Sequence, residues 1–250
     1  MNRVICFGEA LVDQVHTEKG LLNYPGGAPA NVATNIARLG GTSRFLGAIS
    51  NDQLGTVLLD ALERAKVDTS SIIRTDKPTA RAEITLENQG ERHFQFFCED
   101  TADQAFQAAD FTNHALSGQF FHFGSNSMTT ESSWKTTLFG VQKAKKNGHF
   151  VSFDLNWRPP FWKNWPARLG DPLERIWHVL EWVDLLKLSE EEFDQLGEKA
   201  LSRLEQTPVA HLIITQGARG AKWLHLPTHS SQSFPARRVT CRDSTGAGDA

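Results

Sequence analysis

Short apolar runs alternate with helical patterns along most of this chain. The first run, residues 4–7, ends at Gly8, as a buried strand does where it opens into a loop. After Gly26 and Gly27, apolar residues recur at helical spacing up to the next glycine pair. The alternation continues to a strand of apolar and β-branched residues at 212–215. Repeated strand and helix units of this kind predict an α/β fold with a mostly parallel sheet covered by helices.

One segment has a different period. Apolar and polar residues alternate from residue 81 to residue 87, and a turn signal at 88–90 leads into Phe94 and Phe96. This period of two predicts a half-exposed β-hairpin outside the main sheet. An isolated hairpin is not stable in water. We therefore expect Phe94, Phe96 and Phe97 to pack over a substrate or against a second copy of the chain, which would make a homodimer.

Composition excludes several classes of partner. The net charge is −3 and no run of Lys and Arg is long enough to bind a phosphate backbone, so we expect no nucleic acid partner. No stretch of about 18 apolar residues occurs and the N-terminal segment lacks the pattern of a signal peptide, so we expect no membrane partner. Cys6, Cys98 and Cys241 lie far apart in the chain, which favours reduced thiols in a cytoplasmic protein.

The last eight residues, DSTGAGDA, form the most informative motif. The small residues Gly246, Ala247 and Gly248 would let backbone amides approach an anion closely. If a helix starts here, its free N–H groups would hold developing phosphate charge. Asp249 could then take a proton from a hydroxyl held in line with the phosphoryl group. A plain glycine turn with Asp249 as a helix cap is the alternative.

The loop GGAPAN at residues 26–31 is a second candidate binding site. It stands at a strand-to-helix switch, where open α/β sheets bind ligands. Asn31 can both donate to and accept from hydroxyl groups, and Asp13, at the end of the first strand, can accept from a diol. Taken singly, Asn31 could equally be a helix cap, and Asp13 a loop carboxylate.

Two motifs offer polar side chains at the ends of later strands. DLNWR, at residues 154–158, ends in Arg158, which could clamp a phosphate through two hydrogen bonds or simply pair with Asp154. KLSEEE contains Ser189 and Glu192 at the spacing of a capping box, which caps a helix start. Glu192 could also orient water on a magnesium ion.

The motif TQGARG at residues 215–220 closes a buried strand with two glycines. It could hold nucleotide phosphate or ribose, and a turn between two strands is the alternative. Two common nucleotide-binding motifs are absent from the sequence: the P-loop G-x-x-x-x-G-K-[ST], and G-x-G-x-x-G after the first strand. ATP would therefore have to be bound by a different arrangement of residues. The nine histidines show no paired spacing that would predict a protein-held zinc ion.

The chain resembles the ribokinase-like (phosphofructokinase-B type) carbohydrate kinases, and fructokinases most closely, in six motifs: GEALVD, GGAPAN, FDLNWRPPFW, KLSEEE, TQGARG and DSTGAGDA. The resemblance runs over residues 4–250. It implies one kinase domain over residues 1–250 with a three-layer α/β/α ribokinase-like fold, a mostly parallel central sheet, and a small β-sheet lid from parts of residues 9–30 and 72–100. The implied activity is ATP-dependent phosphorylation of a small sugar, fructose first, with ribose, a nucleoside or 2-keto-3-deoxygluconate as alternatives.

The resemblance also implies a role for each motif residue. The catalytic base would be Asp249, and the anion hole would consist of Gly246, Ala247 and Gly248. The substrate side would be formed by Asp13, Gly27, Asn31 and Arg158. The nucleotide side would be lined by Lys187, Ser189, Glu192, Thr215, Gly217 and Gly220. The implied cofactors are ATP and Mg²⁺, with Glu192 acting on the magnesium through water, and K⁺ is a further candidate, at Asp243 and the Thr245 carbonyl.

Three departures from the family pattern bear on these expectations. Ser50 replaces a glycine of the first signature, which we expect to be a tolerable loop change. Cys98 replaces an arginine found in many fructokinases and ketodeoxygluconate kinases, which argues against an acidic sugar. The family continues past Ala250 with a helical segment, so we expect the C-terminal part to be missing and ATP affinity to suffer. A catalytically impaired sugar-binding or regulatory protein is therefore the alternative of a different class.

Overall fold

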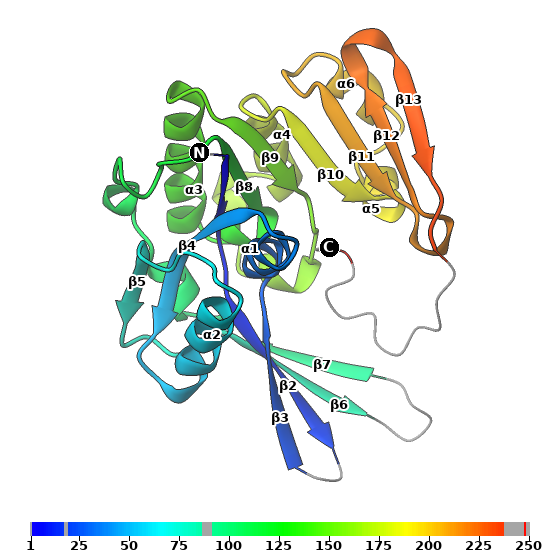
Figure 1. The fold of residues 1–250 in the computed structure, drawn as a ribbon. Helices are drawn as coiled ribbons and strands as arrows, with labels where there is room; N and C mark the ends of the chain where they lie inside the picture. Colours follow the sequence, from blue (N-terminus) through cyan, green and yellow to red (C-terminus); the bar gives the residue numbers. More distant parts are fainter. Residues whose placement is uncertain (1, 18–19, 87–91, 238–247, 249–250) are drawn as a thin grey trace. The chain divides into compact units, whose positions relative to one another are not determined.

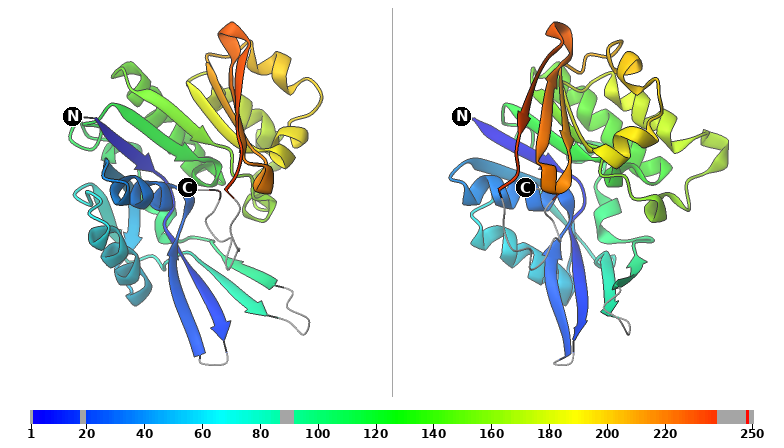
Figure 2. Two further views of the ribbon diagram at one scale, coloured as in Figure 1. Left: turned by 45° about the vertical axis from the view of Figure 1, so that its right-hand side comes forward. Right: turned by 90° about the vertical axis from the view of Figure 1, so that its right-hand side faces the viewer.

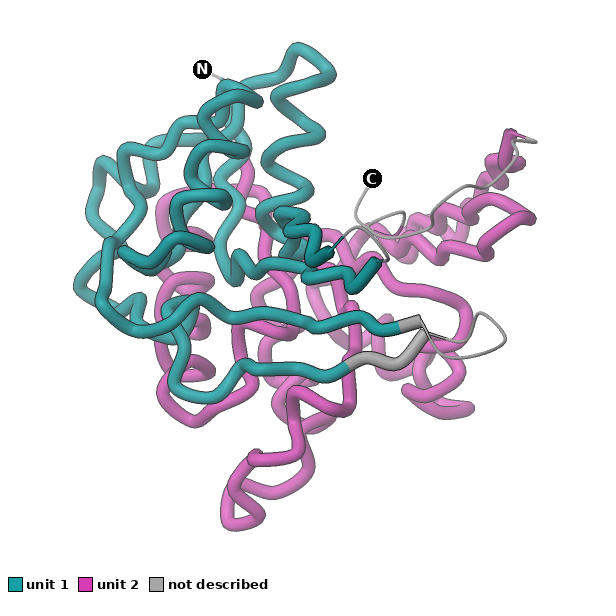
Figure 3. The backbone as a smooth tube through the Cα atoms, turned by 90° about the horizontal axis from the view of Figure 1, so that it is seen from below, with its two compact units in different colours: residues 1–119, 249–250 teal, residues 120–248 magenta. Residues whose placement is uncertain are grey.

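A computed structural model describes residues 2–17, 20–86, 92–237 and 248 of the chain. The chain divides into two compact units, residues 1–119 with 249–250 and residues 120–248, which Figure 3 draws in two colours. Both units contain parallel strands with helices, and the first also contains a smaller sheet. Within the described ranges, we find no helix with the length and apolar character that a membrane span requires.

The main sheet of the first unit is parallel. Its strands follow the order β1 (Arg3–Phe7), β4 (Thr42–Ser50) and β5 (Ile72–Thr75). Helices α1 (Ala28–Arg38) and α2 (Gln53–Arg64) belong to the same unit (Figure 1). Every residue of β4 after Thr42 is buried, which explains why this strand has a continuous apolar run rather than an alternating one.

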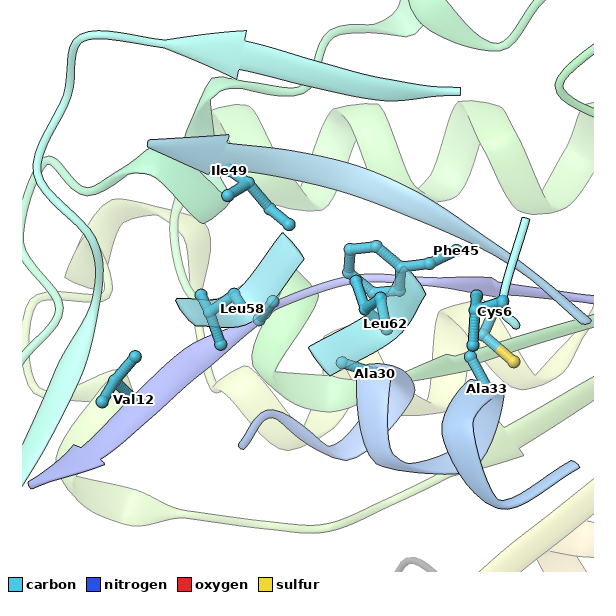
Figure 4. Close-up of a cluster of buried hydrophobic side chains, with 10 residues drawn as sticks. Cys6, Val12, Ala30, Ala33, Phe45, Ile49, Leu58 and Leu62 are labelled. Atoms are coloured by element: carbon cyan, nitrogen blue, oxygen red, sulfur yellow. The ribbon is translucent and has the colours of Figure 1, made fainter. Parts of the chain in front are cut away.

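The core of this unit lies between the strands and the two helices. Figure 4 shows Phe45 of β4 and Leu62 of α2 beside Cys6 of β1 and Ala33 of α1. All four are almost completely buried. Burial of one Leu or Phe side chain stabilises a fold by about 1.5–3 kcal/mol, so this cluster fixes α1 and α2 against the sheet. The start of α1, where the GGAPAN loop lies, is thereby held in place.

The smaller sheet contains four strands and projects from the first unit (Figures 1 and 2). Its order is β3 (Gly20–Gly26), β2 (Leu11–Thr17), β6 (Arg81–Leu86) and β7 (Arg92–Phe97). β6 and β7 pair antiparallel, as the alternating pattern predicted, and β2 pairs antiparallel with β3 and parallel with β6. The connection at residues 87–91 lies outside the described residues.

The second unit has a six-stranded sheet with helices against it. Parallel strands β8 (Phe120–Gly124), β9 (Phe150–Asp154), β10 (Leu185–Ser189) and β11 (His211–Thr215) are followed by antiparallel β12 (Ala221–His225) and β13 (Ser230–Phe234). The helices are α3 (Glu131–Lys146), α4 (Pro172–Leu180), α5 (Glu190–Gln195) and α6 (Ala200–Leu204). The strand predicted at 212–215 is therefore confirmed as β11, and strands and helices alternate through this unit as predicted.

Short 3₁₀ turns complete the described chain. They span Ala102–Ala105, Ala108–Asp110, Ser125–Met128, Pro159–Trp162, Ala167–Leu169, Gly217–Arg219 and Leu226–Thr228. Ser125–Met128 directly follows β8, and Leu226–Thr228 directly follows β12, so both set where the chain turns at a strand end. Gly217–Arg219 lies between β11 and β12.

Candidate active site

In the first unit, the GGAPAN loop joins β3 to α1 through two tightly packed glycines. Gly27 has a φ of 100° and is the N-cap of α1, so Asn31 lies inside the first turn and is not the cap. A Cβ on Gly27 would lie 2.5 Å from the Glu9 carbonyl oxygen, so only glycine allows this approach of two backbone segments. The Asn31 N–H donates to the Gly27 carbonyl over 2.9 Å, which begins the helix.

The Asp13 carboxylate lies directly over the neighbouring glycine. A Cβ on Gly26 would be 2.9 Å from Asp13 Oδ2. Asp13 lies within β2, and not at the end of the first strand or in a loop as expected from the sequence, because the chain enters the small sheet directly after β1. It is opposite Tyr24 of β3 and Ala82 of β6, and paired residues of neighbouring strands project from the same face. Asp13, Tyr24 and Ala82 therefore share one face of the small sheet, beside the start of α1.

If Asp13 binds the sugar, as the family resemblance implies, the Gly26→Ala substitution should weaken sugar binding with little loss of stability. The new methyl group would displace the Asp13 carboxylate, and loss of a hydrogen bond to a charged group would raise the KM for sugar about 10- to 100-fold. Steady-state kinetics on Gly26→Ala, Asp13→Ala and the double variant test this. An unchanged KM in Gly26→Ala, or a double variant whose KM rises by the product of the two single effects, would contradict it.

In the second unit, polar side chains gather where the parallel strands end. β8, β9, β10 and β11 end on Gly124, Asp154, Ser189 and Thr215. Asp154 and Lys187 are register partners, and Lys187 Nζ lies 2.7 Å from Asp154 Oδ2. Asp154 thus pairs with Lys187 of the neighbouring strand. Arg158, the sequence-based alternative, is exposed at the start of a 3₁₀ turn.

Glu192 joins two backbone segments. Its carboxylate accepts hydrogen bonds from the Ser189 N–H over 2.8 Å and from the Trp157 N–H over 2.6 Å. The Ser189 hydroxyl in turn accepts from the Glu192 N–H, which completes the predicted capping box at the start of α5. The buried Glu192 carboxylate therefore fixes the DLNWR segment against the strand that carries KLSEEE.

The TQGARG segment turns the chain from β11 into antiparallel β12. Gly217 and Gly220 both have positive φ, and a Cβ on Gly220 would overlap the Phe234 carbonyl oxygen. Thr215 Oγ1 donates to the Leu188 carbonyl over 3.4 Å. The motif therefore forms the turn between two strands that was one of its two predicted roles. Thr215 lies close to the end of β10.

Several predicted site residues lie outside the described residues. These are Asp243, Thr245, Gly246, Ala247 and Asp249. Gly248 is described, and its carbonyl accepts a hydrogen bond from Lys187 Nζ. Within the second unit, Gly248 of this motif therefore contacts Lys187 near the end of β10.

His122 of β8 is a buried titratable residue that the sequence analysis did not single out. Its Nδ1 lies 3.1 Å from Ser152 Oγ, and its Nε2 has no hydrogen-bond partner among the described residues. Burial, followed by the positive charge of Lys187, lowers the pKa of His122 to about 4. The side chain is therefore neutral at physiological pH.

This pKa predicts a loss of stability in weak acid. The unfolded chain takes up the proton near the ordinary pKa of 6.5, whereas the folded protein resists it down to about 4. The contribution of His122 to the free energy of unfolding should stay constant above pH 6.5 and fall by about 3 kcal/mol as the pH drops towards 4. Urea unfolding between pH 7 and 4 measures this, with His122→Asn expected to have the shallower dependence. Equal pH dependence in both proteins would contradict it.

Comparison with known proteins assigns the class of this molecule. Over 99% of the chain, the structure superposes on the fructokinase with bound ATP from Xylella fastidiosa, with a TM-score of 0.91, 37% identity and 78% of that chain covered. The Vibrio cholerae fructokinase in its fructose, ADP and calcium ion bound form gives a TM-score of 0.86 at 32% identity, over 100% of this chain and 81% of that one. The predicted ribokinase-like α/β fold with its small second sheet is confirmed.

The family follows from the sequence comparison. A family model described as pfkB family carbohydrate kinase matches residues 1–250, and the chain belongs to this family. The fructokinase of Salmonella typhimurium is 36% identical over 258 residues, which cover 99% of this chain and 81% of that protein. The fructokinase of Klebsiella pneumoniae is 37% identical over 99% of this chain and 81% of its own length. The predicted activity of a carbohydrate kinase, with ATP as its phosphoryl donor, is thereby confirmed.

Tyr24 and the pair formed by Lys187 and Asp154 were missed as interacting residues. Tyr24 is the only tyrosine in the chain, and its position opposite Asp13 depends on the register of β2 and β3. The available signal was the alternation of side chains around Asp13, which places every second residue on one face. Lys187 and Asp154 are 33 residues apart, so only the order of the strands brings them together.

Proposed function

We propose that this protein transfers the γ-phosphoryl group of ATP to a hydroxyl of fructose. The observation that carries the choice of sugar is the similarity to fructokinases, at 36–37% identity over 99% of the chain for the two bacterial relatives named above. The solved Vibrio cholerae fructokinase has fructose and ADP bound, and the match covers 100% of this chain and 81% of that one. Cys98 in place of an arginine also favours a neutral sugar over an acidic one.

On the sugar side, Asp13, Gly27 and Asn31 hold the hydroxyl groups of the substrate. The Asp13 carboxylate accepts hydrogen bonds from two hydroxyls of one sugar, which a single amide oxygen does less strongly. Its place over Gly26, with no Cβ between them, supports this role, because a ligand can approach the carboxylate closely. Arg158 faces the substrate or its phosphates, and its exposed guanidinium is free to reorient towards them.

On the nucleotide side, ATP lies against residues at the ends of β10 and β11. They are Lys187, Ser189, Glu192, Thr215, Gly217 and Gly220. Each Glu192 oxygen accepts one backbone N–H and keeps a second lone pair, so the carboxylate can also accept from a magnesium-bound water. This donor set suits Mg²⁺, which neutralises charge on the β- and γ-phosphates when it is bound. Asp243 and the Thr245 carbonyl remain our candidates for K⁺.

Phosphoryl transfer needs a base and an anion hole at the DSTGAGDA motif. Asp249 accepts the proton of the attacking sugar hydroxyl, while the Gly246, Ala247 and Gly248 amides donate to the oxygens that gain charge. The new bond joins the sugar oxygen to the γ-phosphorus, and the bond to the leaving oxygen of ADP breaks. The resemblance of this motif to the family pattern supports these assignments.

A panel of sugars in an ADP-release assay tests this function. We expect fructose to give the highest kcat/KM among fructose, glucose, ribose, a nucleoside and 2-keto-3-deoxygluconate. A site whose polar groups bind the hydroxyls of one sugar strongly rejects a sugar that lacks one of those hydroxyls. Ribose, which has fewer hydroxyls than fructose, should therefore be the poorer substrate. Preference for one of the other compounds would overturn the choice of sugar. Sugar-dependent thermal stabilisation without ADP release would overturn the kinase activity.

We also propose that the small sheet is a lid over the sugar that forms a homodimer with a second copy. Leu22 and Tyr24 of the edge strand β3 are 43% and 50% exposed, and an exposed edge with apolar side chains favours pairing with another chain. Phe97 is partly covered by the Arg81 guanidinium, 4.1 Å from the ring centroid. Light scattering should give twice the monomer mass, and Leu22→Lys should halve it. A monomeric wild-type protein would contradict the dimer.

A further inference from the structure

The two faces of the small sheet have different surroundings. Val12 of β2 projects from one face and is completely buried in the core cluster that also contains Leu58 of α2 (Figure 4). Asp13 is the next residue of the same strand, and successive side chains of a strand point to opposite faces. The face that carries Asp13 is therefore the one turned away from this core cluster.

Apolar and aromatic residues surround Asp13 on its face of the sheet. Tyr24 of β3 and Ala82 of β6 are its register partners, and Phe96 of β7 is the register partner of Ala82. These four residues form one row across the sheet, because register partners project from the same face. The described residues of the next row are apolar as well; they are Leu22, Val15 and Ile84. Asp13 is thus the one carboxylate in the described part of these two rows.

Tyr24 is the member of this row with the most surface left for a ligand. It is 50% exposed, whereas Ala82 is only 2% exposed and Phe96 is partly buried. The tyrosine ring offers a large apolar surface, and its hydroxyl can both donate and accept a hydrogen bond. Covering the exposed part of the ring would remove apolar surface from water, which favours binding. The row therefore suits a molecule that has hydroxyl groups for Asp13 and an apolar face for Tyr24.

A neutral sugar has both of these features. Its hydroxyl groups donate to a carboxylate, and the C–H groups on one side of its ring form an apolar face. Small-molecule sites in proteins commonly combine aromatic surface with a few placed polar groups. Asp13 and Tyr24 supply one group of each kind, on neighbouring strands of the same sheet.

We propose that Tyr24 is a specificity-determining residue of the sugar site, whose ring covers the C–H face of a neutral sugar while Asp13 accepts hydrogen bonds from its hydroxyl groups. This inference rests on the proposed function, in which Asp13 holds the sugar. The effect of the ring does not require the homodimer proposed above. A ring that covers the sugar before and during transfer binds the ground state and the transition state alike, so Tyr24 should act on the KM for fructose and leave kcat little changed.

Calorimetric titration of fructose in the absence of ATP tests this role in the full chain. We expect Tyr24→Ala to weaken fructose binding about 10-fold, because the sugar loses the apolar surface of the ring. Tyr24→Phe should recover most of the affinity, since it keeps the ring. An unchanged fructose affinity in Tyr24→Ala would overturn the proposal.

Leu21→Ala is the matched control. Leu21 is 47% exposed on the same strand, but its register partner is His16, so it projects from the opposite face of the sheet. This substitution removes a similarly exposed apolar side chain and should leave the affinity for fructose unchanged. A loss as large as that of Tyr24→Ala would show that any change in β3 disturbs the site, which would overturn the specific role of Tyr24.

A spectroscopic readout is available because Tyr24 is the only tyrosine in the chain. Labelling tyrosine with ¹³C gives ring signals from this residue alone. We expect fructose to shift these signals with the affinity that calorimetry measures, and nuclear Overhauser effects to connect the ring protons to the C–H protons of the sugar. Ring signals that do not change at any fructose concentration would overturn the proposal.

Two comparisons separate this inference from the other proposals. If fructose shifts the ring signals but no phosphoryl group is transferred to it, the proposed kinase function fails and the role of Tyr24 is supported. If the shift is lost in Leu22→Lys, the variant designed to be monomeric, the signals respond to the contact between two copies. The role of Tyr24 in the sugar site would then be overturned.

Discussion

The Asp249→Asn substitution is expected to lower kcat by about 10³-fold or more while fructose still binds. The amide keeps the size and much of the hydrogen bonding of the carboxylate, but it cannot accept the proton of the attacking hydroxyl. Turnover should therefore fall, and the KM for fructose should change much less. Single-turnover assays of ADP release, with calorimetric titration of fructose, separate the two effects.

Asp60→Asn is the control for this substitution. Asp60 is an exposed carboxylate on the outer face of α2 and takes no part in the proposed chemistry. It should leave both kcat and fructose affinity unchanged. Wild-type turnover in Asp249→Asn would exclude Asp249 as the base, whereas loss of fructose binding in that variant would assign it to substrate binding instead.

The second large expected effect is a loss of stability when Arg44 is replaced. This guanidinium is only 2% exposed, and Arg44 Nη2 lies 2.7 Å from Asp68 Oδ2. Its Nη1 donates to the hydroxyl of Ser117 over 3.0 Å and to the carbonyls of His114 and Ala115. These bonds join β4, near its amino end, to residues 114–117.

Arg44→Met should destabilise the protein by about 3 kcal/mol, because the acceptors around the buried guanidinium lose their donor and Asp68 loses the nearer of its ionic partners Arg44 and Arg3. The midpoint of urea unfolding measures the change. Arg38→Met is the matched control, since Arg38 is an exposed arginine at the end of α1 and should shift the midpoint little. A loss of less than about 1 kcal/mol in Arg44→Met would show that the network contributes no more than a surface pair.

Acid should reduce the difference in the free energy of unfolding between the wild-type protein and Arg44→Met. Desolvation raises the pKa of Asp68, but hydrogen bonds from Ser70 and Arg44 outweigh it and lower this pKa to about 2, from an ordinary 3.8. A carboxyl with a depressed pKa contributes stability above pH 3.8 and loses it as the pH falls towards 2. The wild-type protein and Arg44→Met should therefore become more alike across this window.

The buried parts of the fold could be predicted from the sequence, and the exposed edges could not. β1 and β4 contain continuous apolar runs, at residues 4–7 and 45–49, because strands covered on both faces need no alternation. In contrast, β13 has the sequence SSQSF and is exposed at every position, so nothing in its composition distinguishes it from a loop. β3 is also largely exposed, with a pattern fixed only by its pairing with β2.

The candidate site likewise has features that the sequence predicts and features that depend on how the strands pair. The glycines of GGAPAN were predictable, because a close backbone approach at Gly27 requires glycine. The pairing of Asp154 was not, since Arg158 is four residues away in sequence whereas Lys187 is on another strand. The position of Tyr24 opposite Asp13 likewise depends on strand register, which a single sequence does not specify.

Transfer of label from [γ-³²P]ATP to fructose is the most direct test of the proposed reaction. We predict that, with Mg²⁺ present, the label appears in fructose phosphate in a one-to-one ratio with ADP, and that inorganic phosphate forms far more slowly. Label that appears only as inorganic phosphate, or that stays in ATP while fructose is bound, would contradict the assignment of this chain as a fructose kinase.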